Sequence, residues 1–173
     1  LDACFAGEPL KRVALSCGGE TRRGEVIITS RGLEGGAIYA LTPVIREAIQ
    51  RDGAARLGLD LRPDISLEDL AARLASTRKG DSRANVLRKA AKLSPAAIAV
   101  LRDAANNELP AEPAALAALV KAVPLSATAL GDLATAISTA GGVAWSEMDD
   151  RFMLKKLPGI FCAGEMLDWE APT

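Results

Sequence analysis

Residues 13–29 read VALSCGGETRRGEVIIT and predict a β-hairpin near the start of the chain. Residues 13–17 are a short apolar run typical of a strand, and the turn signal Gly18-Gly19-Glu20 follows it. Residues 24–29 predict the returning strand, because three consecutive β-branched side chains favour a pleated sheet over a helix. We therefore assign residues 10–41 to β structure.

A glycine-rich loop, RGLEGG, follows the hairpin and contains Arg31, Gly32, Gly35 and Gly36. Two interpretations stay open. The glycines provide a tight β turn that needs positive φ, or the N–H groups of the loop face a ligand, as backbone nests face anions. The apolar residues 37–41 after the loop continue the β-rich part.

One helix and one strand follow. Thr42 is a good N-cap and Pro43 a good first residue for a helix that runs to about Arg51, and Gly53 is placed to end it. Apolar side chains then alternate over residues 55–61, which predicts a half-buried strand.

Residues 64–135 predict a block of helices. Apolar residues recur at i, i+3, i+4 and i+7 in segments that open at Ser66, Ser82, Ser94 and Pro113. A further helix is expected after Pro124, where the spacing is repeated by Leu130, Leu133, Ala134 and Ile137.

A basic stretch lies in this block, formed by Arg78, Lys79, Arg83, Arg88, Lys89 and Lys92. One interpretation is a solvated helix face, because acidic residues interleave and no aromatic residue accompanies the cations. The other is a docking face for an anionic substrate or a partner protein.

Composition excludes several kinds of site. The 173 residues include 21 basic and 22 acidic ones, so nothing indicates binding to nucleic acid or to an anionic membrane. The lack of histidine excludes a His general base and most zinc sites within the chain, so no metal is expected. Three separated cysteines, Cys4, Cys17 and Cys162, indicate reduced thiols and a cytoplasmic location.

The last residues, 157–173, read LPGIFCAGEMLDWEAPT. Residues 160–163 are an unbroken apolar run, which predicts a buried strand. Gly164 and Glu165 follow at once, the order expected where a ligand meets the carboxyl end of a strand. The alternative is a buried edge strand that turns into a loop with a solvated Glu165.

Upstream of this segment, residues 140–143 (AGGV) predict a close-packed turn or strand crossing. Trp145 lies beside the apolar Val143 and Ala144, so we expect it to cover the core.

Together these motifs resemble the BaiN-like flavoproteins, bacterial proteins usually described as predicted NAD(FAD)-utilising dehydrogenases. GEVIITSRGLEG at residues 24–35 is similar to a motif in the insert of that family, although Ser30 and Gly36 stand where the family commonly has His and Pro. A role that rests on that His is therefore not carried over. The late motifs of the resemblance are AGGV at 140–143, Glu147, Asp149, KKLPG at 155–159 and AGEMLD at 163–168.

The resemblance implies a segment of a longer FAD-dependent oxidoreductase, in which a hydride passes from NAD(P)H through the flavin to an unsaturated small molecule. Gly164, Glu165 and Asp168 would then meet the flavin, and the loop at residues 31–36 would face the flavin or the substrate. Catalytic residues stay unassigned. The flanking FAD-binding domain would be the partner, and this chain alone, which has no G-x-G-x-x-G, is not expected to bind FAD.

The expected fold is α+β, a small sheet or partial barrel capped by five or six helices and inserted into a dinucleotide-binding-type flavoprotein. Residues 1–63 would be β-rich with one helix, residues 64–135 helical, and residues 136–173 strands that return to the FAD-binding domain. The resemblance also favours β structure at residues 136–139. The alternative function is a non-catalytic helical interaction module, in which Gly164 and Glu165 are structural.

Overall fold

The predicted hairpin is the centre of the sheet in a computed structural model that describes residues 5–78, 80–136 and 138–170. Strand β1 (Pro9–Cys17) pairs antiparallel with β2 (Glu20–Thr29). The two-residue loop between them is Gly18-Gly19, with φ of 57° and 87°. Such short loops need positive φ at both positions, which glycine adopts without a steric penalty. Sequence predictions for Cys4, Lys79 and Ile137 lie outside the described residues.

Three more strands extend this hairpin to a five-stranded antiparallel sheet in the order β3-β2-β1-β4-β5. They are β3 (Gly32–Glu34), β4 (Ala55–Asp60) and β5 (Val123–Ala127). The sheet is a half-barrel and six α-helices accompany it in the described residues, so the predicted α+β class is confirmed.

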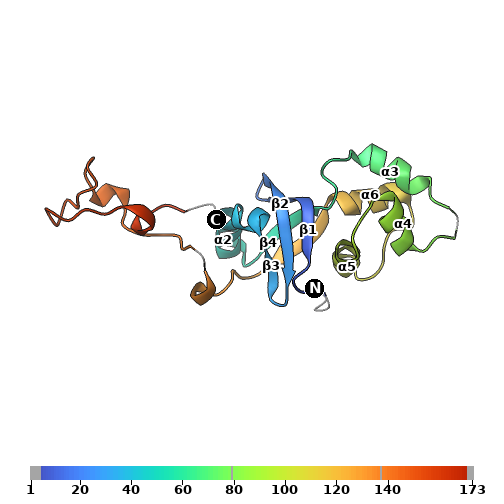
Figure 1. The fold of residues 1–173 in the computed structure, drawn as a ribbon, viewed down its shortest axis with the longest axis horizontal. Helices are drawn as coiled ribbons and strands as arrows, with labels where there is room; N and C mark the ends of the chain where they lie inside the picture. The colour runs from blue at the N-terminus through green and yellow to red at the C-terminus, as the bar shows by residue number, and fades with distance from the viewer. Residues whose placement is uncertain (1–4, 79, 137, 171–173) are drawn as a thin grey trace. The chain divides into compact units, whose positions relative to one another are not determined.

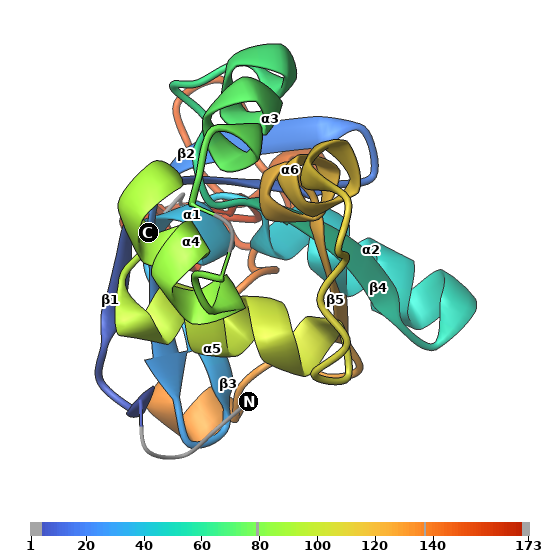
Figure 2. The same cartoon turned by 90° about the vertical axis from the view of Figure 1, so that its right-hand side faces the viewer.

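Two helices precede β4, and four helices separate it from β5. Figures 1 and 2 show the first pair on one side of the sheet and the second group on the other. Within the second group, α5 contacts β1 and β5, α6 contacts β4 and β5, and α3 packs on α6. The helices are α1 (Gly36–Tyr39), α2 (Thr42–Asp52), α3 (Leu67–Ala75), α4 (Arg83–Ala90), α5 (Pro95–Ala104) and α6 (Pro113–Lys121).

Local capping signals predicted where α3, α4, α5 and α6 begin. The hydroxyl groups of Ser66 and Ser94 accept hydrogen bonds from Asp69 N and Ala97 N, at 3.0 and 3.2 Å. Gly53 ends α2 in the left-handed conformation. The N-cap assigned to Thr42 is wrong, since Leu41 holds that position and the Thr42 hydroxyl donates to Ile38 O at 3.2 Å.

Two secondary-structure predictions are wrong. Residues 37–41 do not continue the β structure; Ala37 lies in α1 and Leu41 in the turn between α1 and α2, and both are fully buried. The helix expected after Pro124 does not form in the described residues. Residues 123–127 are instead β5, because the free edge of β4 offers a ladder of backbone hydrogen bonds there, and Leu130 and Leu133 lie beyond this strand. Leu133 consequently stays on the surface in a single 3₁₀ turn.

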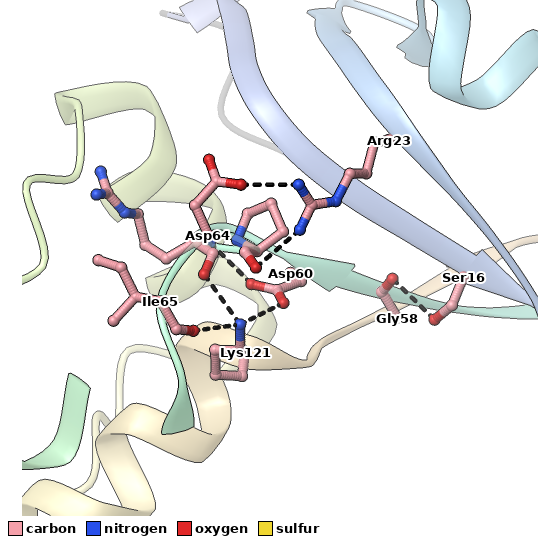
Figure 3. A network of polar contacts seen from close by, with 9 residues as sticks. Ser16, Arg23, Gly58, Asp60, Asp64, Ile65 and Lys121 are labelled. Atoms are coloured by element: carbon pink, nitrogen blue, oxygen red, sulfur yellow. Dashed lines mark hydrogen bonds and ion pairs between the residues drawn. The ribbon is translucent and has the colours of Figure 1, made fainter. Parts of the chain in front are cut away.

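The junction between β4 and α3 is fixed by two basic side chains (Figure 3). Lys121, at the end of α6, forms an ion pair with Asp60 at 2.7 Å and donates to Arg62 O and Ile65 O at 2.9 and 2.8 Å. Arg23 of β2 contacts Asp64 at 2.7 Å from the other side. The turn that leads into the helices is therefore tied to both the sheet and α6.

The chain divides into two compact units, Leu1–Ala129 and Leu130–Thr173. The first holds the sheet, the six helices and an apolar core. The second has a small core of Met148, Cys162 and Leu167, and its described residues pair only through isolated β-bridges.

Two predictions for the second unit are wrong. Residues 160–163 are not a buried strand, because Ile160 and Phe161 are 52% and 62% exposed and only Phe161 forms a bridge, with Met153. An apolar run becomes a strand only where a neighbouring strand accepts its backbone hydrogen bonds, and no ladder runs beside this one. For the same reason the described residues 136, 138 and 139 form no strand.

Across the described residues, no helix combines the length and the apolar character needed to cross a membrane.

The buried face of α3 gives a direct test of the core. Leu70→Ala removes a fully buried side chain and should lower the free energy of unfolding by about 2–5 kcal/mol. Leu67→Ala, on the same helix but 41% exposed, should change it by less than about 1 kcal/mol. Urea unfolding of both variants measures the difference, and equal losses would show that α3 does not face the core as described.

Candidate functional site

The C-terminal candidate residues lie together in one loop of the second unit. Gly164, with φ of 78°, opens a 3₁₀ turn that ends at Met166, and Glu165 and Asp168 are both exposed. Buried Cys162 and Leu167 hold the two ends of this turn in the small core. The structure therefore brings the three candidate residues together and leaves both carboxylates open to solvent.

The AGGV segment supports this loop from behind. Val143 N donates to Met166 O at 2.8 Å, and Asp168 N donates to Val143 O at 3.0 Å. A Cβ on Gly142 would lie 2.5 Å from Met166 O, so only glycine fits between the two segments. The predicted close-packed crossing at residues 140–143 is thereby confirmed.

Trp145 lies beside the same loop but does not cover a core. Its indole Nε1 donates to Asp168 O at 2.8 Å, and its ring meets the edge of Phe152 with 6.2 Å between centroids. The side chain is 53% exposed, so the prediction that it covers the core is wrong. The reason is the size of this unit's core, three small or medium side chains that cannot enclose an indole.

The other candidate loop, residues 31–36, belongs to the first unit. Arg31 is exposed, whereas Gly35 is buried at the start of α1 with φ of 108°. A Cβ at Gly35 would lie 2.6 Å from Glu25 O, so this glycine is required by the turn itself. Gly32 also has a positive φ, of 148°, while Gly36 has open space around it. The turn interpretation accounts for Gly32 and Gly35, and a ligand-facing role for the loop stays a prediction.

Sequence reasoning missed a shallow pocket of about 370 Å³ at the end of the β1–β2 hairpin. Its wall includes Cys17, Gly18 and Gly58. The signal that could have found it is the lack of side chains at Gly18 in the hairpin loop and at Gly58 in β4. Burial raises the pKa of the Cys17 thiol above its ordinary value, which keeps it protonated and disfavours a nucleophilic role.

The second unit also contains an ion pair between charged side chains. Lys156 forms an ion pair with Glu147 at 2.7 Å, and this contact lowers the pKa of Glu147. In the part of the chain that the structure describes, no three His, Cys, Asp or Glu side chains gather as metal ligands would.

The glycine requirement can be measured with two neighbouring variants. Gly35→Ala should lower the free energy of unfolding by about 1–3 kcal/mol, because alanine at a positive φ is strained and its Cβ meets Glu25 O. Gly36→Ala lies in open space within α1 and should be neutral or slightly stabilising. If thermal unfolding showed both variants equally stable, the turn would not explain Gly35.

Comparison with known families agrees with this architecture. The family model described as HI0933-like protein barrel and H2TH domain matches residues 1–138, which include the sheet, all six helices and the loop at residues 31–36. The match does not extend to Gly164, Glu165 or Asp168. The chain belongs to the HI0933-like family, a flavoprotein-related family, through this barrel and H2TH domain.

Proposed function

We propose that the chain is the insert and return segment of a BaiN-like, FAD-dependent oxidoreductase. The observation that carries this proposal is the surface of the second unit. In the described residues, nine of the ten large apolar side chains that are exposed lie in residues 130–169. Exposed apolar surface on this scale, beside a core of three residues, is typical of a segment that packs against another body.

The flanking FAD-binding domain is the body that we propose to cover this surface. It would come from the same longer polypeptide, as the motifs at residues 140–168 and the membership of a flavoprotein-related family both favour. Under this proposal the half-barrel and its helices shape the substrate side of the site and exclude water from it.

The residues of the C-terminal loop fit one part of an FAD site. Apart from its two chain neighbours, Gly164 has no residue within 4 Å of the position that a Cβ would take, so a ligand can approach the backbone there. Glu165 and Asp168 are exposed carboxylates, which accept hydrogen bonds from hydroxyl groups such as those of a ribityl chain. When bound, FAD would supply the redox chemistry, with NAD(P)H as the proposed hydride donor and an unsaturated small molecule as the acceptor.

The cytoplasm is the proposed location. Both described cysteines, Cys17 and Cys162, are free thiols, and unpaired buried thiols are usual in a reducing compartment.

Glu165→Ala in the flavin-loaded longer protein tests the role of the loop. A hydrogen bond to a charged carboxylate contributes about 1.5–3 kcal/mol, so the variant should bind FAD about 10- to 150-fold more weakly. Asp150→Ala is the matched control, because Asp150 is exposed in the same unit and, unlike Glu147, holds no ion pair there. Flavin titration of the apoprotein gives both affinities. Equal affinities in folded wild type and Glu165→Ala would favour the non-catalytic interaction module.

A further inference from the structure

A strongly basic surface covers α3, α4 and the turn between them. Residues 73–92 contain seven basic residues and one acidic residue, a net charge of +6 in a chain whose net charge is −1. The remainder of the chain therefore carries −7. Six of the seven cations are described and all six are exposed; we call them the basic surface, formed by Arg73, Arg78, Arg83, Arg88, Lys89 and Lys92.

Most of these cations have no partner within the described part of the chain. Lys89 forms an ion pair with Asp81 at 3.2 Å, and Arg88 donates to Asn85 at 3.1 Å. Among the described residues, the other four side chains form no hydrogen bond or ion pair. Basic side chains near the β4–α3 turn, such as Arg23 and Lys121, are by contrast fully engaged. The basic surface is thus available to an external anion.

The centre of the basic surface is a shallow pocket of about 270 Å³, bordered by Arg73, Lys89 and Lys92. The hydroxyl groups of Ser76 and Thr77 also line it, but they already donate to Arg73 O and Leu74 O, at 2.9 Å each. Helices α3 and α4 end beside it, so their carbonyl ends, and not their N–H ends, are near. A compact phosphate favours helix N-termini and fixed N–H donors, so the pocket does not suit one.

A long nucleic acid also fits poorly. It would run from the basic surface onto the rest of the chain, whose charge of −7 repels it. No aromatic residue lies between Tyr39 and Trp145, so there is no platform on which bases could stack. A set of carboxylates spread over an area as large as the basic surface fits better, because each flexible lysine or arginine side chain can form an ion pair with a separate carboxylate.

We propose that the basic surface docks an acidic patch on a partner protein. Arg73, in the last turn of α3, and Lys92, just after the end of α4, both border the pocket and are the central contacts. This inference is independent of the proposed flavoenzyme function, because it uses only α3, α4 and their charges.

An octaglutamate peptide is a suitable probe. Added to the ¹⁵N-labelled chain, it should shift amide resonances mainly in residues 73–92, and its affinity should fall as salt rises to about 150 mM. Arg73→Gln with Lys92→Gln should weaken binding by about 2- to 30-fold, as expected for the loss of two exposed ion pairs. Lys11→Gln with Arg102→Gln removes two other exposed cations and should leave the affinity within about twofold.

Several results would overturn the proposal. These are resonance shifts spread over the whole chain, equal weakening in the two double variants, or tighter binding of pyrophosphate or of a short DNA duplex than of the peptide. Unchanged thermal unfolding of the variants ensures that any loss of binding reflects charge and not folding.

Discussion

Strand β4 determines how the first unit is built. It pairs with β1 on one edge and with β5 on the other, so the chain must leave β4, form α3 to α6, and return beside the same strand. Lys121 fixes this return, because its ammonium group binds Asp60 at the end of β4 and two carbonyl groups of the turn that follows (Figure 3). The ion pair is only about one-fifth exposed, so water screens it less than a surface pair. With these ends held, the apolar faces of α5 and α6 pack on the sheet and complete one core.

The two units differ in how far their large apolar side chains are buried. The first buries its large aliphatic side chains between sheet and helices, whereas the second leaves Trp145, Phe161 and Trp169 about half exposed or more. Hydrogen bonds between the Val143 and Met166 segments nevertheless give the second unit a defined path and present Glu165 and Asp168 on one loop. A short segment with defined backbone contacts and an uncovered apolar surface is the form expected of one side of an interface. We propose that the FAD-binding domain is the other side.

Turns, helix caps and close backbone crossings that depend on residues adjacent in the sequence were predictable from the sequence. The Gly18-Gly19 loop, the Ser66 and Ser94 caps and the Gly142 crossing each depend on the chemistry of a few consecutive positions or on the lack of a side chain. Strand β5 was not predictable in this way, because residues 123–127 become a strand only by pairing with β4, more than sixty positions earlier. The exposure of residues 160–161 and the pocket beside Arg73 and Lys92 likewise depend on segments that meet only in the folded chain.

Hydrogen exchange tests the central claim, that the second unit is one half of an interface, most directly. We expect amides in β1, β2 and β4 to be strongly protected in the 173-residue chain, while those of residues 143–167 exchange readily because few buried contacts hold them. In the flavin-loaded longer protein, residues 143–167 should gain protection of at least about tenfold, and the β1–β2 hairpin should change little. Equal protection of residues 143–167 in the two proteins would contradict the claim, since it would show that this unit needs no covering domain.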